Sequence, residues 1–536
     1  MAYTHAQHSE DARLLLPSES NATINDDTEQ ASITEERNES YLTYVISMAF
    51  GLFLIAMNGI IIVALYASIG SELNQLQSAS WIPTAYMLTQ TSFQPLAGKL
   101  SDLFGRKACL LTCYGIYAFG SLIFGLSITM TQLIVARAIS GIGSGGITIL
   151  VTIIMSDIVS LRTRGTWQGL LNLVSAAGST IGALLGGFFA DTISWRWPFL
   201  LQVPLFGIAF LSVLFTRLPT TKSSTPPENT KRIDFGGAIT LVLTVFFLLF
   251  GLDRGGNTSW SDWRTVGSLT VFAIFASLFV FIETSVASEP FAPTRIVSNR
   301  SLLPCYVSGF FASGAASTLV FYIPLFYQAA EGMTASEASA WLIFGIIGGL
   351  VGSLVAGLVM QHTGKYYGIT VISHFLVLAG TGIAFISSGV FVVSTIGIAI
   401  GMGTTEVGIG GGVVTTLTAL IAHAGQADQA TATAVAYLFR SLGSVFSLAV
   451  GGALFQNTLR YLLHKRLSGE DVQEIVKRVR QSLSYLNQLD PVTKATVVQS
   501  YQDAIKVIFL FSAAIATLAT ISSLFIKEKE LTHARP

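Results

Sequence analysis

Long runs of apolar residues alternate with short polar segments along most of the chain, from about residue 42 to residue 526. Each run is about 20 residues long, the length that an α-helix needs to cross roughly 30 Å of hydrocarbon. The pattern predicts an all-α membrane protein with spans in a group of six, a pair and a second group of six. The fourteen predicted spans are 42–66, 80–98, 108–127, 131–156, 166–190, 197–216, 235–251, 266–286, 303–327, 338–360, 368–388, 391–422, 431–455 and 503–526.

The polar segments suggest how the chain is divided. Residues 1–40 are acidic and poor in aromatic residues, which predicts a disordered cytosolic tail. Lys and Arg gather in every second loop, and this bias places both termini in the cytosol. The remaining predicted regions are a six-helix bundle over 41–218, a linker with two inserted spans over 219–302, a second six-helix bundle over 303–526 that includes a non-cytosolic helical loop at 456–502, and a cytosolic tail over 527–536.

Glycine patterns indicate that the two groups of six spans are copies of one unit. Gly357, Gln361 and Gly364 follow the tenth span with the spacing found after the second span, at residues 98–105. The fifth span carries Gly178, Gly182, Gly186 and Gly187, and the thirteenth echoes them with Gly443, Ser447, Gly451 and Gly452. Membrane proteins built from two such repeats bind their substrate near the midplane between the repeats. We therefore expect a binding site there, with the inserted pair outside the symmetry.

Composition and motifs exclude several classes of protein. Hydrophobic residues make up 51% of the chain and charged residues only 11%, whereas soluble domains average about 25% charged residues. The net charge is zero, and no basic cluster is interleaved with aromatic residues, so nucleic acid is not an expected partner. The three cysteines have no accompanying histidines, which favours buried apolar side chains over a metal site. No nucleotide-binding, zinc-protease or serine-hydrolase motif is found, so we expect neither an enzyme nor a cofactor.

The loop at residues 98–107 holds three cations, one acid and two glycines. Asp102 and Arg106 lie one helical turn apart and can pair with each other or with a neighbouring helix end. The pattern resembles the signature loop of the major facilitator superfamily at Gly98, Asp102, Gly105, Arg106 and Lys107. This resemblance implies a cytosolic conformational switch. Asp157, at the end of the fourth span, would face Arg106 as a latch that holds one state and is released in another.

The fifth span also resembles this family, whose exporters and antiporters have a glycine-rich signature there. Glycines four residues apart let a second helix approach closely, and packing alone is a sufficient cause for the stripe. The resemblance implies that the stripe lies at the interface that opens and seals, although the proline of the usual pattern is missing. The stripe consists of Gly178, Gly182, Gly186 and Gly187.

Two of the thirty Lys and Arg residues fall inside predicted spans, Arg137 and Arg440. A charge at the bilayer centre costs at least ~2.5–3.5 kcal/mol, so each should face a cavity or a partner. Arg137 matches the fourth-span arginine of the family, which is associated with proton transfer. Arg440 resembles the arginine of the penultimate span in fourteen-span members. Either residue could instead be a structural arginine tied to backbone carbonyls.

Glu406 is the carboxyl nearest to the middle of a predicted span. Removal from water favours the protonated form of a carboxyl, so Glu406 could couple protons or bind a cationic substrate. It could also be a static partner for Arg440 or Arg137. Fourteen-span drug:proton antiporters usually have a first-span aspartate where this chain has Asn58, which cannot carry a proton. His374 could shuttle protons, although a lone histidine is more often hydrogen-bonded inside a bundle.

The resemblance covers residues 42–526 and is strongest to the fungal fourteen-span drug:proton antiporter branch, especially its vacuolar basic amino acid transporters. It implies a proton-coupled antiporter that moves Lys, Arg or His from the cytosol into the vacuole. A plasma-membrane exporter of drugs or siderophores is the alternative, and a transporter-like nutrient receptor is the alternative of another class. The expected partners are a small cationic substrate, protons and the lipid bilayer.

The tail contains one apolar island. Glu10 and the pair Leu14-Leu15 resemble the acidic dileucine signal that sorting adaptors read on membrane proteins bound for lysosomes and vacuoles. A possible adaptor is therefore a further partner. The sequence leaves open the exact substrate, the oligomeric state and whether Asn257 is glycosylated.

Overall fold

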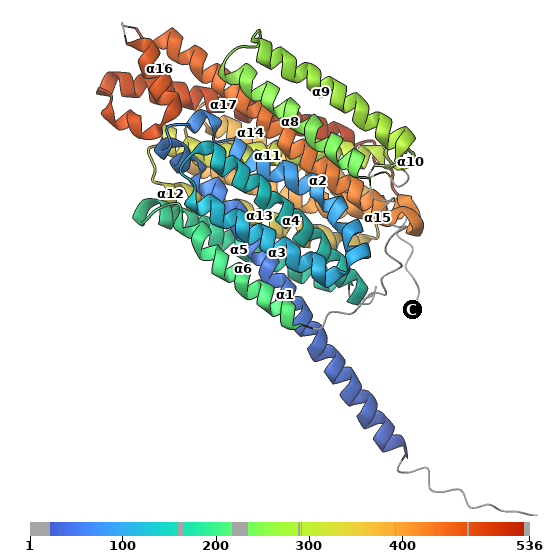
Figure 1. Cartoon of the computed structure of the whole chain (residues 1–536). Coiled ribbons are helices and arrows are strands. Elements are labelled where there is room, and N and C mark those ends of the chain that lie inside the picture. Colours follow the sequence, from blue (N-terminus) through green and yellow to red (C-terminus); the bar gives the residue numbers. More distant parts are fainter. Residues whose placement is uncertain are drawn as a thin grey trace, which may run out of the picture. The chain divides into compact units, whose positions relative to one another are not determined.

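The structure is a computed structural model that describes residues 22–158, 164–216, 234–287, 290, 292–391, 393–468 and 471–529. Within these residues all regular structure is helical, apart from one isolated β-bridge between Ser388 and Val393. The helices carry the labels of Figure 1, which colours the chain from blue to red. The all-α fold predicted from the hydrophobic pattern is confirmed.

The chain divides into two compact units, residues 1–46 and 47–536. The first unit contains the beginning of helix α1 (Ala22–Glu72), so half of the expected disordered tail is helical. From Ala22 to Phe50 the sequence has neither glycine nor proline, the residues that most strongly oppose a helix. The apolar span can therefore extend as a helix toward the N-terminus. Leu14 and Leu15 lie outside the described residues, and the sorting interpretation stays a prediction.

The first bundle begins at Ser47 of α1. In it α4 packs between α2 and α3, and α6 packs on α3. Buried aromatic rings join α3 and α6. The ring centroids of Tyr117 and Phe206 are 4.4 Å apart, and those of Phe124 and Phe199 are 4.3 Å apart. The other elements are the turn η1 (Leu76–Ser78), α2 (Trp81–Phe104), α3 (Arg106–Leu126), α4 (Met130–Ile158), α5 (Arg164–Thr192) and α6 (Trp197–Phe215).

The second bundle repeats this plan. Its elements are α11 (Leu303–Ala330), α12 (Ala335–Ala340), α13 (Leu342–Thr363), α14 (Tyr367–Ser387), α15 (Thr395–Arg466) and α17 (Pro491–Ser523). A capping box of Thr334 and Glu337 starts α12. Helix α15 is continuous in its hydrogen bonds but contains two membrane crossings, because Gly425 has φ +73° and breaks the helical backbone between them.

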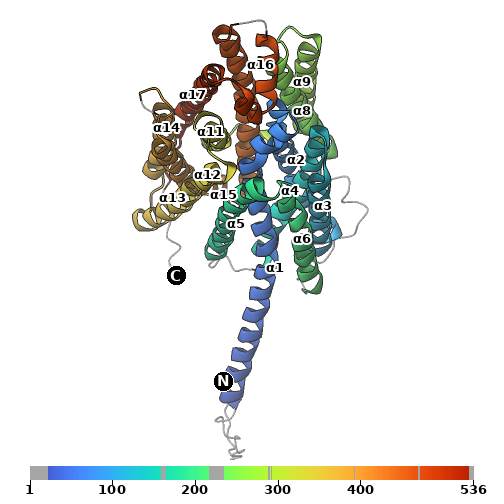
Figure 2. The same ribbon diagram turned by 90° about the vertical axis from the view of Figure 1, so that its left-hand side faces the viewer.

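The inserted pair lies between the two bundles in the sequence. Helix α8 (Phe235–Asn257) is capped by Asp234, whose carboxylate accepts a hydrogen bond of 2.7 Å from the Gly237 amide. It packs on α9 (Trp263–Phe281), and also on α2 and α15. Figure 2 shows α8 and α9 together beside α2. A π-helical turn (Ile282–Val286) and the short α10 (Thr294–Val297) lead on to the second bundle.

The loop expected at 456–502 is shorter in the structure, because both flanking helices extend into it. Helix α15 continues to Arg466, and α17 begins at Pro491 behind the N-cap residue Asp490. Helix α16 (Val472–Gln481) and the 3₁₀ turn η4 (Leu483–Gln488) lie between them. An ion pair of Arg466 with Asp503 ties the two long helices together.

The number of spans agrees with the prediction as far as the described residues allow. Thirteen helices there are long and apolar enough to cross a membrane. They coincide with thirteen of the predicted spans. At the position of the remaining one lies α2, which is 24 residues long. A count of fourteen is therefore compatible with the structure.

Candidate functional site

A buried polar chain crosses the first bundle. The Arg137 guanidinium on α4 donates a hydrogen bond of 2.6 Å to Oδ1 of Asn58 on α1, and Nδ2 of Asn58 donates one of 2.7 Å to Oε1 of Gln202 on α6. The exposed fractions of the three side chains are 2%, 1% and 0%. Asn58 thus uses both ends of its amide to link three helices. Sequence reasoning missed Gln202, which is uncharged and lies in an otherwise apolar span.

Aromatic rings complete the surroundings of Arg137. Its guanidinium carbon lies 4.2 Å from the centroid of the Tyr86 ring and 5.8 Å from that of Phe124. Tyr86 donates a hydrogen bond to the Ser144 hydroxyl. In the part of the chain that the structure describes, no carboxylate lies within 4 Å of Arg137. Its charge is therefore balanced by an amide oxygen and by π-faces, not by the backbone carbonyls considered above.

In the second bundle Glu406 and Arg440 lie on the two crossings of α15. The Glu406 side chain faces α13 at Gly345 and Gly349, where the absence of a side chain leaves room for it. Glu406 and Arg440 interact electrostatically, but among the described residues no ion pair within 4 Å joins them. Nε of Arg440 donates a long hydrogen bond of 3.4 Å to the Ser313 hydroxyl. Glu406 therefore has a cation near it but is not locked to that cation.

His374 is held by its own helix. Its Nδ1 lies 2.8 Å from the carbonyl oxygen of Thr370, one turn earlier on α14. The ring is 2% exposed and packs against Gly412 of α15. This arrangement corresponds to a hydrogen-bonded histidine inside a bundle, the alternative to proton shuttling that the sequence left open.

The expected switch region lies where α2, α3 and α4 end. Gly105 has φ +89°, a conformation that favours glycine, and it separates α2 from α3. Nε of Arg106 donates a hydrogen bond of 3.2 Å to Asp157, which closes the expected pair between α3 and the end of α4. Lys107 donates to the carbonyl oxygens of Leu214 and Thr216 at the end of α6. Gly98 packs near Ile153 of α4. The Asp102 side chain lies outside the described part of the chain.

The glycine stripe of α5 has two different neighbours. A Cβ atom on Gly178 or Gly182 would overlap the carbonyl oxygen of Phe53 or Met57, and Gly186 packs closely on Ile61, so three glycines face α1. Gly187 instead lies against α12 of the second bundle, close to Ser336 and Ser339. The stripe therefore holds the first bundle together along most of its length and touches the opposite bundle at one end.

Among the described residues, the hydrogen bonds between the bundles lie at the end of α1 and α5 that is expected to face away from the cytosol. The Tyr66 hydroxyl donates to the Phe321 carbonyl oxygen at 2.9 Å, and the two rings stack with centroids 4.0 Å apart. The Ser336 amide donates to Asp191 at 2.8 Å. The Leu483 amide, in the loop after α16, donates to the Ser71 hydroxyl at 3.0 Å. The two bundles are thus joined at this end.

Known proteins are similar to this chain in sequence and in fold. Residues 48–448 match the family model described as Major Facilitator Superfamily. The vacuolar membrane amino acid uptake transporter fnx2 of Schizosaccharomyces pombe is 37% identical over 489 residues, which cover 90% of this chain and 84% of that protein. Vacuolar basic amino acid transporter 2 of Saccharomyces cerevisiae is 30% identical over 463 residues, with coverages of 83% and 96%. Other relatives are named as a multidrug resistance protein or as efflux pumps.

Solved structures agree on the architecture. A bacterial homologue of the human lysosomal transporter Spinster, in an inward-facing and unoccupied conformation, matches with a TM-score of 0.62 at 14% sequence identity. The match covers 91% of this chain and 97% of that chain. With the family model covering most of the chain and relatives aligned along nearly all of it, the chain belongs to the major facilitator superfamily and is a multi-pass membrane transporter, not an enzyme.

Proposed function

We propose that this transporter exchanges protons for basic amino acids and moves Lys, Arg or His from the cytosol into the vacuole. The observation that carries the proposal is Glu406, a carboxyl group inside the first crossing of α15 that lies near Arg440 and, among the described residues, has no ion-pair partner within 4 Å. The names of two relatives, a vacuolar amino acid uptake transporter and a vacuolar basic amino acid transporter, support the substrate class and the membrane.

Glu406 can couple the two fluxes by mutual exclusion. A carboxyl group that is withdrawn from water is stable either as the neutral acid or beside a cation. A proton and the ammonium or guanidinium group of a basic amino acid would therefore compete for it. Arg440, on the other crossing of α15, offers a positive charge toward the substrate carboxylate. Asn58 cannot titrate and is occupied by Arg137 and Gln202, so the first bundle supplies polar contacts and no coupling acid at this position.

The contacts at the two ends of the bundles support an alternating-access mechanism. The bundles are joined at the non-cytosolic end through Tyr66, Asp191 and Ser71. Arg106 and Asp157 at the opposite end form an ion pair within the first bundle. We propose that this pair, together with the rest of the loop at 98–107, stabilises one state of the cycle and that the non-cytosolic contacts must separate before substrate is released there.

Uptake of radiolabelled lysine and arginine into sealed vesicles that contain the purified protein tests the proposal. An imposed proton gradient should drive accumulation of both, and collapse of the gradient by a protonophore should remove it. Protein-free vesicles are the control. Binding of lysine without any transport would instead favour a nutrient receptor.

A second candidate is export of drugs, which the relatives named as a multidrug resistance protein and efflux pumps favour. The same vesicles discriminate between the two. Gradient-driven uptake of a cationic dye such as ethidium, with no uptake of lysine or arginine, would replace the amino acid proposal by this one.

A further inference from the structure

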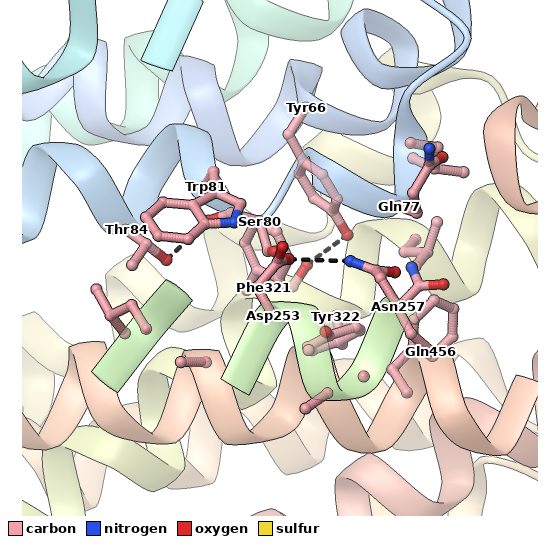
Figure 3. Close-up of a pocket in the computed structure, with 18 residues that line it drawn as sticks. Tyr66, Gln77, Ser80, Trp81, Thr84, Asp253, Asn257, Phe321, Tyr322 and Gln456 are labelled. Carbon is pink, nitrogen blue, oxygen red and sulfur yellow. Dashed lines mark hydrogen bonds between the residues drawn. The ribbon is translucent and has the colours of Figure 1, made fainter. Parts of the chain in front are cut away.

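A cavity that contains one carboxylate, Asp253, lies away from Glu406, where three parts of the fold meet. It lies between α1 and α2 of the first bundle, α8 of the inserted pair, and α11 and α15 of the second bundle (Figure 3). Its volume is about 40 Å³, which is room for a few water molecules or for one ammonium group. The side chains that give it its chemistry are Tyr66, Trp81, Asp253, Asn257, Phe321 and Tyr322.

Asp253, in the last turns of α8, places its carboxylate in this cavity, which we call the junction pocket. Its Oδ1 accepts a hydrogen bond of 3.0 Å from Nδ2 of Asn257 (Figure 3). Among the described residues no Lys or Arg lies within 4 Å of it. The neighbouring Arg254 turns aside, with its guanidinium 5.6 Å from the centroid of the Phe250 ring. A half-buried carboxylate that lines a cavity and has no ion-pair partner attracts a cation or a proton.

The walls of the pocket suit an organic cation. Phe321 stacks on Tyr66 with centroids 4.0 Å apart and meets Tyr322 edge-on with centroids 5.2 Å apart. Trp81 lies on the other side of Asp253 in Figure 3. Aromatic faces attract ammonium and guanidinium groups, and a carboxylate among such faces supplies the opposite charge and hydrogen-bond acceptors. An anionic group would be repelled by the carboxylate, and a neutral group would lack the attraction of opposite charge.

Two arginines, Arg460 of α15 and Arg480 of α16, hold one side of the pocket in place. Arg480 of α16 donates to Oδ1 of Asn257 at 2.9 Å and to Oε1 of Gln456 at 3.0 Å. Arg460 donates to the carbonyl oxygen of Thr258 at 2.9 Å. Asn257 is therefore held by Arg480 at its Oδ1 while its Nδ2 holds Asp253.

We propose that the junction pocket is a second cation subsite, in which Asp253 receives the ammonium or guanidinium group of the substrate between Glu406 and the non-cytosolic exit. This inference rests on the proposed function, because it assumes a basic amino acid as substrate. The pocket now has room for one such group and not for a whole amino acid. Separation of Tyr66 from Phe321, which also opens the non-cytosolic end, would admit the rest of the molecule.

Equilibrium binding of radiolabelled lysine to the full-length protein in lipid nanodiscs, at one fixed pH, tests the subsite. Asp253→Asn should weaken binding by about thirty-fold or more, the effect of removing one partner of a buried charge pair. Asp253→Glu should recover most of the affinity. Asp262→Asn removes a carboxylate at the start of α9, outside the pocket, and should leave binding within about two-fold of the wild type.

A variant that leaves the charge in place separates chemistry from folding. A Cβ atom on Gly452 would lie 3.6 Å from the Ser80 hydroxyl and 3.7 Å from the Tyr322 hydroxyl. A small side chain is therefore tolerated there, and Gly452→Val should fill the pocket and also weaken lysine binding. Size-exclusion profiles and thermal transitions identify any variant that fails to fold.

Two results would overturn the subsite while the proposed function stands. One is wild-type affinity for lysine in both Asp253→Asn and Gly452→Val. The other is an unchanged affinity in Asp253→Asn with only the pH profile of uptake shifted, which would make Asp253 a proton carrier alone. A wild-type protein that binds no basic amino acid would instead reject the proposed function itself.

Discussion

The two bundles share a backbone plan and differ in the chemistry placed on it. In the first bundle Gly178 and Gly182 of α5 face α1, and in the second Gly443 of α15 packs in the same way on α11, where a Cβ would overlap the Phe310 carbonyl oxygen. Gly314 of α11 likewise packs against Ser447 of α15. Helix crossings that depend on missing side chains are thus kept in both halves, because larger residues would push the helices apart.

At the polar centre the correspondence between the halves breaks down. Gly141 of α4 packs on the backbone of Tyr86, and Glu406 of α15 lies at the matching crossing against Gly345 of α13. In the first bundle the large side chain, Tyr86, is on α2 and faces a glycine of α4. In the second bundle the large side chain, Glu406, is on α15 and faces a glycine of α13. In the first bundle the Tyr86 ring covers Arg137. In the second bundle the Glu406 side chain occupies the corresponding space. The comparison suggests that one half is a fixed support and the other carries the coupling chemistry.

The largest expected effect is that of removing the Glu406 carboxyl group from the second bundle. Glu406→Gln should abolish gradient-driven uptake of lysine and arginine, because the amide cannot exchange a proton. His374→Gln is the control in the same bundle and should retain uptake within about two-fold, since His374 is bound to Thr370 and packed. Accumulation by Glu406→Gln vesicles in proportion to the gradient would contradict the assignment of coupling to Glu406.

The next effect sharpens the role of the first bundle as a support. Asn58→Leu should lower stability by about 3–5 kcal/mol, the cost of leaving a buried charge without its partner, since Arg137 loses its amide acceptor. Asn58→Asp places a carboxylate beside the guanidinium and should restore a folded protein. Thermal unfolding in detergent measures both. Equal transition temperatures for the two variants would mean that Asn58 does not support Arg137.

The shared backbone plan predicts matched effects in the two halves. Gly182→Ala and Gly443→Ala should each destabilise the protein by about 1–3 kcal/mol, as overpacked sites do, because a Cβ would overlap a carbonyl oxygen at either place. Gly207→Ala is the control, since nothing lies within 4 Å of a Cβ at that position. Thermal transitions and the yield of monodisperse protein report the result. A loss in one half alone would break the structural equivalence.

The smallest effect concerns the ion pair at the cytosolic end of the first bundle. Asp157 is 43% exposed and Arg106 only 12%, and partly exposed pairs contribute about 0–1 kcal/mol. Asp157→Asn should therefore change the turnover rate of lysine transport by a few-fold and leave equilibrium binding unchanged. Initial rates and binding isotherms, measured on the same preparation, separate these quantities. A large loss of binding affinity would place Asp157 at the substrate and not at a switch.

The sequence was sufficient for the fold, and it singled out Arg137, Glu406 and Arg440 as charges that the structure places inside helices. Apolar runs marked the helices, since lipid requires every backbone group to be paired within a helix or barrel, and charges inside those runs stand out. It could not reveal Gln202 or the partners of Asn58, because uncharged polar residues are common in spans and their pairing depends on helix rotation. Asp253 was missed since its place near a span end resembles that of an ordinary loop charge.

Helix boundaries at the non-cytosolic side were also beyond the pattern. Arg466 lies outside the predicted spans and Asp503 is the first residue of the last one, yet both lie well inside longer helices or at their ends and are paired with each other. Hydropathy records where a helix enters lipid, and a helix can continue into water when its side chains find partners. The long α15 and α17 are examples, and α15 lines the junction pocket.

The break at Gly425 has an electrical consequence. Glu406 and Arg440 lie on consecutive crossings joined by this short connection, so a movement that shifts both crossings in the same direction would carry both charges together. With Glu406 ionised the moving charges cancel, and the membrane potential does no net work on them. With Glu406 protonated, one positive charge moves, which is worth about 2.3 kcal/mol per 100 mV for a full crossing. Under the proposed function, voltage would thus act on the carrier loaded with a proton or with a cationic substrate, and leave the empty, ionised one untouched.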